Sequence, residues 1–444
     1  MPAEQGPDSK NPLFGVVGHG YQPPRELEVD VDFGGRHHHA GYSVVPWVNP
    51  RITEQVYRPI LGEVESLPPG LVTSVYAPLR SYLKRYNPEL FAKIKDVIGR
   101  TPDKEYSVLG DSLVHAILPL LPSEDQAMLL EAGRIAFRRD FGFDAKGIWL
   151  PETAVSREVL HNAAQAGYEF VPLHDSQIGV IPEGVNLDAD HNVCFVHPGG
   201  EGEEIAVLLG NSGLSERVSY HQWTTYNADA FMDGRKQIEA ANGWNSLLMM
   251  DLERFGHHQP GAEEFLKRIL SIQQNFGFSP LNMQAVLEEY KQGKPKTVVE
   301  VRDNSSWSCP HGLGRWTGNC GCDDPSESVL RAKRHFYSSL QELNSLVNSG
   351  LDAIAPGWRK EFARLFAELS DDIFTGVNFG PALCAEVIDK GGDEEKARLY
   401  LAKIEVVVGM TSCGWFFGQN DGYERNIPAS MIAGARDLLA VPSA

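Results

Sequence analysis

Short apolar runs alternate with helical patterns up to about residue 325, and this alternation limits the possible folds more than any other feature. The apolar runs read as strands at Leu13–Gly18, Ser107–Leu109, Ile148–Leu150, Glu169–Leu173 and Ser246–Met250. Helical spacing is found at Thr53–Glu65, Ser74–Ile98, Ser123–Arg139, Val155–Ala166, Asn227–Ala241, Gly261–Phe276 and Leu281–Lys291. The alternation predicts an α/β fold whose mainly parallel sheet has helices outside it. Functional side chains should then gather at the carboxyl ends of the strands.

Two segments depart from this rhythm. Asn192–Val196 and Glu204–Leu209 flank Pro198-Gly-Gly200, which predicts a hairpin. After about residue 326 the patterns are all helical, at 326–349, 358–369, 381–388, 394–410 and 429–439. We therefore expect a flexible N-terminal arm over residues 1–12, an α/β unit over 13–325 and a helical domain over 326–444. A chain of 444 residues is long enough for two packed units.

Composition excludes several classes of protein. A formal net charge of −19 argues against a nucleic-acid partner and favours a neutral or cationic ligand. No apolar run approaches the ~18–20 residues that a membrane span needs. The polar N-terminus lacks a signal-peptide pattern, so we expect a cytoplasmic protein. Six cysteines are too few for a disulfide scaffold, and nothing in the sequence indicates an oligomeric state.

A single carboxylate follows the apolar run that ends in Trp149-Leu-Pro-Glu152. Pro151 cannot donate to a strand ladder and favours an extended Leu150, so Glu152 should lie where a buried strand ends. Such a position presents chemistry in α/β barrels. Glu152 could instead cap the helix that starts near Val155.

Three further polar clusters follow predicted strands: His19-Gly-Tyr-Gln22, His115, and Asp251-Leu-Glu-Arg-Phe-Gly-His257. Imidazole, amide and phenol groups suit hydrogen bonding to hydroxyls. Each cluster has a structural alternative, because His115 could be a core histidine and Asp251 a helix cap. If all four clusters share one face of a barrel, two carboxylates and an aromatic platform meet there, as in glycosidases.

These residues resemble motifs of glycoside hydrolase family 57. The Trp149-Leu-Pro-Glu152 motif matches the family's nucleophile motif, and Asp251 to His257 matches its acid/base motif except that Leu252 replaces glycine. His19-Gly-Tyr-Gln-Pro23 is similar to an expanded His-Gln-Pro motif, and His115 precedes a Pro-Leu step as in the family. The similarity is closest to a poorly characterised bacterial branch, which also has counterparts of residues 304–322 and 411–417.

The resemblance implies an incomplete seven-stranded TIM-like β/α barrel over residues 13–325, whose active-site cleft the helical domain completes. It implies a retaining mechanism on α-1,4-glucans that uses no cofactor. Glu152 would be the nucleophile and Asp251 the acid/base, with carboxyl groups about 5–5.5 Å apart and a raised pKa at Asp251. Glu253 and Arg254 could help to set its proton. The expected substrate-binding residues are His19, Gln22, His115, Trp149, Glu253, His257, Trp316 and Trp415, with the three tryptophans as sugar platforms.

A separate segment carries Cys309, His311, Cys320 and Cys322. Three thiols and an imidazole suit a tetrahedral structural zinc site, although the gaps are shorter than in paired Cys-x-x-Cys motifs. The alternative is a glycine-rich substrate loop with reduced cysteines.

Two other functions stay open on the sequence. A metal-dependent polysaccharide deacetylase or mannosidase-like enzyme shares the broad barrel type, and His19 and His115 could serve its metal. A non-catalytic glucan-binding protein is the second, because Leu252 in place of glycine could displace Asp251.

Overall fold

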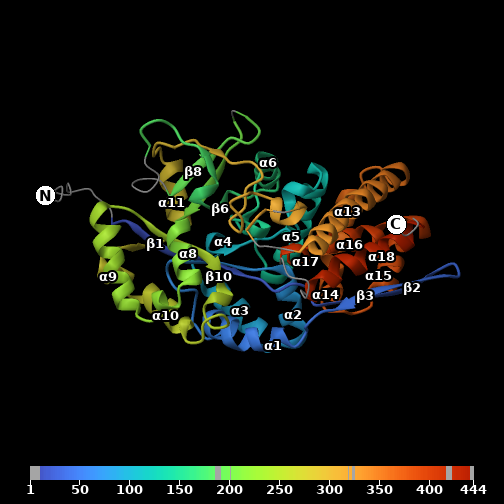
Figure 1. Ribbon diagram of the computed structural model, residues 1–444, viewed down its shortest axis with the longest axis horizontal. Helices are drawn as coiled ribbons and strands as arrows, with labels where there is room; N and C mark the ends of the chain where they lie inside the picture. The colour runs from blue at the N-terminus through green and yellow to red at the C-terminus, as the bar shows by residue number, and fades with distance from the viewer. Residues whose placement is uncertain are drawn as a thin grey trace.

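The computed structural model describes residues 11–185, 192–200, 202–318, 320–322, 326–416 and 423–440. An α/β barrel lies on one side, and a group of C-terminal helices packs against it (Figure 1). Residues 1–10 of the expected N-terminal arm lie outside the described residues. No described helix combines the length and the apolar character needed to cross a bilayer.

Parallel strand pairing runs through seven positions. In spatial order these are β10 (Ser246–Asp251), β1 (Leu13–Gly20), β4 (Leu71–Val75), β5 (Val108–Leu109), residues 147–148, β6 (Phe170–His174) and β9 (Ile205–Gly210). Between β9 and β10, the backbone N–H of Asn211 donates to the Leu247 carbonyl at 2.8 Å, in place of a regular ladder in the described residues. The predicted incomplete seven-stranded barrel is therefore confirmed.

Additional strands lie outside the seven strand positions of this barrel. The predicted hairpin is confirmed, since β8 (Val193–Val196) runs antiparallel to β9. The strands β7 (Ile178–Val180) and β12 (Glu300–Val301) pair antiparallel, and β11 (Ser279–Pro280) lies beside β1. Every residue of β4, β6 and β9 is buried, as expected for parallel strands covered on both faces.

Helices surround the strands. Those of the barrel region are α1 (Val48–Ile52), α2 (Ala77–Tyr86), α3 (Pro88–Arg100), α4 (Lys104–Ser107), α5 (Ser123–Phe141), α6 (Arg157–Gln165), α8 (Ser212–Tyr220), α9 (Ala228–Ile238), α10 (Ala262–Ile272), α11 (Met283–Lys291) and α12 (Gly314–Thr317). The expected helix over residues 53–65 is a π-helix, Thr53–Gly62, that continues α1.

The prediction of one helix over residues 74–98 is wrong. Residues 71–75 form β4, and the helical part is divided between α2 and α3. The division falls at Asn87, where Pro88 disfavours a helical conformation of the preceding residue. The polar pair Thr73-Ser74 interrupts the apolar run of β4 and hides the strand in the sequence.

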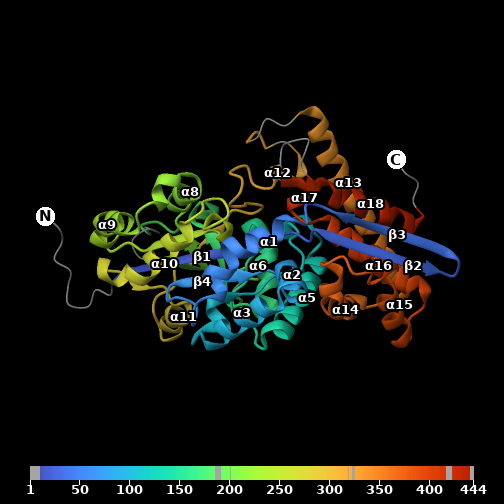
Figure 2. The same ribbon diagram turned by 90° about the horizontal axis from the view of Figure 1, so that it is seen from below.

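A long hairpin was not predicted. It consists of β2 (Glu26–Phe33) and β3 (Arg36–Ser43), which pair antiparallel through a turn at Gly34 and Gly35. Both glycines have positive φ, 57° and 94°, as a type I′ turn requires. The hairpin extends away from the barrel along the C-terminal helices (Figures 1 and 2).

The C-terminal region is helical, as predicted. Its helices are α13 (Glu327–Ile354), α14 (Trp358–Ile373), α15 (Gly380–Asp389), α16 (Glu394–Gly409), α17 (Cys413–Phe416) and α18 (Asn426–Leu439). A fully buried Lys403 on α16 joins them to the barrel. Its Nζ bonds Asp125 on α5 at 2.8 Å, and Asn344 and Asn348 on α13 at 2.6 and 2.8 Å. The two regions therefore share a desolvated polar contact.

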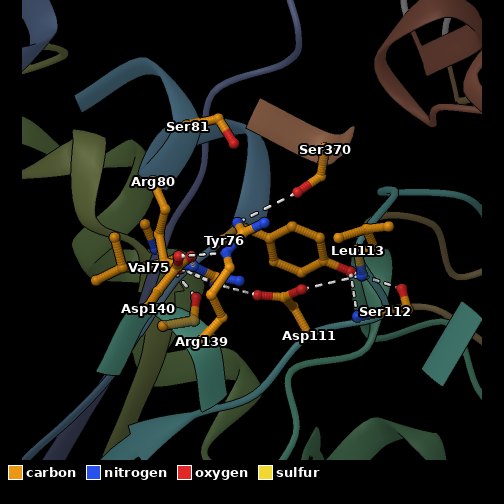
Figure 3. Close-up of polar contacts among 12 residues, drawn as sticks. Val75, Tyr76, Arg80, Ser81, Asp111, Ser112, Leu113, Arg139, Asp140 and Ser370 are labelled. Atoms are coloured by element: carbon orange, nitrogen blue, oxygen red, sulfur yellow. Dashed lines mark hydrogen bonds and ion pairs between the residues drawn. The ribbon is translucent and has the colours of Figure 1, made fainter. Parts of the chain in front are cut away.

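A second buried ion cluster supports the strand ends (Figure 3). Arg80 on α2 is fully buried and contacts the carboxylates of Asp111 and Asp140, the latter at 2.7 Å. Asp111 in turn accepts a hydrogen bond at 2.9 Å from the backbone N–H of Leu113, whose φ is 64°. This cluster fixes the irregular segment that follows β5 and leads to His115.

Candidate active site

Glu152 lies on a strained turn that follows the strand position at residues 147–148. The turn Pro151–Thr153 follows Trp149 and Leu150, and Glu152 and Thr153 have φ of 56° and 45°. Left-handed backbone costs a non-glycine residue on the order of 1–3 kcal/mol unless its surroundings impose it. Here the Ser306 hydroxyl donates to the Glu152 carbonyl at 2.9 Å, and the Trp307 N–H donates to the Thr153 hydroxyl at 3.0 Å. These bonds hold the turn and aim the carboxylate.

Three donors reach the carboxylate of Glu152. The hydroxyl of Ser308 donates to Oε2 at 2.5 Å, the indole Nε1 of Trp307 donates to Oε2 at 3.4 Å, and the hydroxyl of Ser412 donates to Oε1 at 3.0 Å. Burial raises the pKa of Glu152, and these hydrogen bonds oppose the rise because they stabilise the charged form. The three donors thus offset part of the cost of ionising a buried carboxyl group at Glu152.

A hydrogen-bond chain extends behind Ser412. His115 Nδ1 lies 2.8 Å from Ser412 Oγ, His19 Nε2 lies 3.1 Å from His115 Nε2, and Ser74 Oγ lies 2.8 Å from His19 Nδ1. Because Ser412 donates to Glu152, it must accept from His115 Nδ1–H. His115 Nε2 then accepts from His19 Nε2–H, and His19 Nδ1 accepts from Ser74.

Both imidazoles in this chain are neutral. Burial lowers the pKa of His115 to about 3, and burial with the nearby His115 lowers the pKa of His19 well below its usual value. Their rings are also packed, since His19 stacks on Trp149 at 4.6 Å between centroids and His115 on Tyr21 at 4.0 Å. The two histidines therefore orient the groups around Glu152 and carry no charge themselves.

Asp251 ends β10, directly opposite His19 in the β1–β10 ladder. Its side chain is accessible to solvent, although protein surrounds it closely enough to desolvate the carboxylate. This desolvation raises the pKa of Asp251 well above its usual value, and the charges of Glu253 and Glu152 raise it further. A protonated Asp251 beside an ionised Glu152 is the pairing that an acid and a nucleophile require.

Glu253, two residues after Asp251, is buried. Its Oε1 accepts from the Tyr57 hydroxyl, from Gln22 Nε2 at 3.2 Å and from the Tyr21 N–H at 3.4 Å. Burial raises the pKa of Glu253 to about 7, against the effect of these donors. Glu253 and Gln22, predicted to bind substrate, thus bond each other, and Glu253 acts on the proton of Asp251.

Other predicted residues lie elsewhere. Arg254 was expected to help to set the proton of Asp251, but among the described residues it donates to the Val218 carbonyl at 2.6 Å and to Gln259. His257 is half-buried, and its Nδ1 lies 3.1 Å from Gln55 Oε1.

The three predicted tryptophan platforms are covered by protein. Trp149, Trp316 and Trp415 are 0%, 1% and 5% exposed, so none offers a free ring face to a sugar in this structure. Trp149 packs between His19 and Trp307 instead.

Accessible aromatic groups come from residues that we did not predict as platforms. Trp307 is partly exposed and contacts Glu152. Tyr220 ends α8 and Trp223 and Tyr226 follow it; the three are 79%, 64% and 72% exposed. Although the ring is exposed, desolvation by nearby protein and the charges of Asp251 and Glu152 raise the pKa of Tyr220, which places its hydroxyl within the electrostatic reach of both carboxylates. The sequence signal that could have identified Tyr220, Trp223 and Tyr226 was their spacing by three residues at the end of a strand–helix unit.

The sequence matches a known family. Residues 33–302, more than half of the 444 residues, match glycosyl hydrolase family 57. The chain belongs to this family. The deacetylase-like alternative is thereby set aside, and the metal-ligating group found in the described residues contains neither His19 nor His115.

Relatives in family 57 include enzymes of several activities. An α-amylase from Pyrococcus horikoshii is 30% identical over 293 residues, which cover 62% of this chain and 43% of that protein. A 4-α-glucanotransferase from Thermococcus kodakarensis is 24% identical over 289 residues, covering 62% and 42%. The chain therefore spans less than half the length of these relatives.

Solved structures share the fold. An exo-type maltose-forming amylase from Pyrococcus sp. ST04 superposes with a TM-score of 0.72 at 15% identity, covering 97% of this chain and 80% of that one. A branching enzyme from Thermococcus kodakaraensis superposes with a TM-score of 0.54 at 15% identity, covering 97% and 96%.

Proposed function

We propose that the protein is a retaining glycoside hydrolase or transglycosylase that acts on α-1,4-glucans such as glycogen, starch or maltodextrins. The observation that carries the proposal is the unequal environment of two carboxyl groups, since hydrogen-bond donors reach Glu152 whereas carboxylate charges act on Asp251. Three hydrogen bonds offset part of the rise in the pKa of Glu152, whereas desolvation and the charges of Glu253 and Glu152 raise the pKa of Asp251 well above its usual value. The names of the family 57 relatives supply the substrate class.

In the proposed reaction Glu152 attacks the anomeric carbon while Asp251 protonates the leaving glycosidic oxygen. A covalent glycosyl-enzyme forms and the shortened glucan leaves. Asp251, now ionised, takes a proton from the acceptor, which attacks the anomeric carbon and restores the free Glu152 carboxylate. Water as acceptor gives hydrolysis, and a sugar hydroxyl gives transfer.

The test is incubation with maltoheptaose, followed by sizing of the products and by proton NMR of the first anomer formed. Shorter products alone mean hydrolysis, longer products as well mean disproportionation, and new α-1,6 linkages on amylose mean branching. An α-anomer formed first supports retention, and a β-anomer contradicts it.

Two variants test the roles. We expect Glu152→Gln to lower kcat by about 10⁴-fold or more, and Asp251→Asn by about 10²–10⁴-fold. Glu183→Gln, at an exposed turn, is the matched control and should leave turnover unchanged. Full activity in Glu152→Gln would refute the mechanism.

A further inference from the structure

Four metal-ligating side chains meet beside the segment that contacts Glu152. They are Cys309, His311, Cys320 and Cys322, and their ligand atoms all lie within 4.8 Å of one another. Cys309 Sγ is 3.7 Å from Cys322 Sγ and 3.9 Å from His311 Nδ1, and Cys322 Sγ is 3.3 Å from the same nitrogen. In the sequence, the pair Cys309-x-His311 precedes the short helix α12 and the pair Cys320-x-Cys322 follows it.

These separations fit one ion in the middle. In a tetrahedral site with Zn–S of about 2.3 Å and Zn–N of about 2.0 Å, ligand atoms lie roughly 3.5–3.8 Å apart. A disulfide needs sulfurs about 2.0 Å apart, and the six cysteines are free thiols. Three of the four groups, His311, Cys320 and Cys322, are partly or fully exposed, so an ion has a path to them.

We propose that Cys309, His311, Cys320 and Cys322 bind one Zn²⁺ as a structural site. Three thiolates and an imidazole fill all four positions of a tetrahedral ion, which leaves none for a substrate or water. The three thiols release their protons as the metal binds.

The ion would fasten the segment that positions Glu152. Ser306, Trp307 and Ser308 make the contacts to Glu152 and Thr153, and Cys309 follows them directly. In the same loop Asn304 has φ of 58°, and a Cβ at Gly312 would lie 2.4 Å from the Asn304 carbonyl, so this fold is tight. Without a metal, residues 306–308 depend on their hydrogen bonds and on the packing of Trp307 against Trp149 and His174. This consequence for catalysis rests on the proposed function, whereas the metal site does not.

The test is metal analysis of the whole protein, purified with zinc present and then dialysed against a mild chelator. We expect about one zinc per chain, and none in Cys320→Ser/Cys322→Ser. Cys384→Ser on α15 is the matched control and should keep its zinc. His311→Cys should also keep zinc, because it exchanges one ligand type for another, whereas His311→Ala should lose it. Replacement by Co²⁺ should give thiolate charge-transfer absorption in the wild type and in His311→Cys.

Activity and circular dichroism complete the design. In a folded Cys320→Ser/Cys322→Ser variant, we expect kcat on maltoheptaose to fall about 10–100-fold. A folded wild type that retains no zinc, or that forms a Cys309–Cys322 disulfide instead, would overturn the metal site. Zinc loss with unchanged kcat would overturn its positioning role. A zinc-loaded wild type without activity on glucans would instead overturn the proposed function.

Discussion

Ser412→Ala tests the hydrogen-bond chain behind Glu152. The Ser412 hydroxyl donates to Glu152 Oε1 at 3.0 Å and accepts from His115 Nδ1 at 2.8 Å. A hydrogen bond to a charged group contributes about 1.5–3 kcal/mol, and each pKa unit corresponds to about 1.4 kcal/mol. Loss of the donor destabilises the ionised form, so the pKa of Glu152 rises.

The expected result is a shift in the pH dependence of kcat/KM. Glu152 must be ionised to attack, so at a given acidic pH the variant has a smaller active fraction. The acidic limb should move toward neutral pH by about 1–2 pH units. The basic limb, which follows the proton on Asp251, should stay in place. The assay is the initial rate on maltoheptaose across the pH range that the folded protein tolerates.

Ser74→Ala is the matched control, because it makes the same change at the far end of the chain. Ser74 donates to His19 Nδ1 at 2.8 Å and does not touch the carboxylate. The acidic limb of the kcat/KM profile should move much less in Ser74→Ala than in Ser412→Ala. Equal shifts in the two variants, or an unmoved limb in Ser412→Ala, would refute the reasoning.

Three further substitutions test other parts of the structure. Glu253→Gln removes a charge that adds to burial in raising the pKa of Asp251, so the basic limb of kcat/KM should move to lower pH; an unchanged profile would contradict this. Arg80→Met leaves Asp111 as a buried charge without its cation, so the free energy of unfolding measured in urea should fall by about 3–5 kcal/mol. A much smaller fall would show that the cluster is unimportant for stability. Gly133→Ala would place a Cβ 1.8 Å from the Asp111 carbonyl, so it should lower the melting temperature, whereas a helical Gly→Ala change normally adds roughly 1 kcal/mol.

Sequence reasoning located the strand-end residues well. His19 and Asp251 lie in the last two residues of β1 and β10, His115 and Glu152 follow β5 and the strand position at residues 147–148, and the parallel barrel brings the four together. These placements depend on local pattern and on topology, both of which can be read from a single sequence.

Sequence reasoning failed where segments distant in the chain supply the hydrogen-bond partners of Glu152. Ser412 lies 260 residues from Glu152 in the chain, and Ser308 lies 156 residues away. Nothing in a lone serine indicates such a contact, although both lie in motifs shared with the bacterial branch. The tryptophan prediction rested on residue type, and type does not reveal that neighbouring aromatic rings cover Trp149.

The buried contact at Lys403 bears on how this architecture can be divided or recombined. Asp125 belongs to the barrel region, while its cation and its two amide donors come from the C-terminal helices. A barrel fragment made alone would present a bare carboxylate and the apolar surface around it to water. A chimera between family members should therefore take α5, α13 and α16 together from one parent. Replacing the barrel side or the C-terminal side alone would separate Asp125 from its cation.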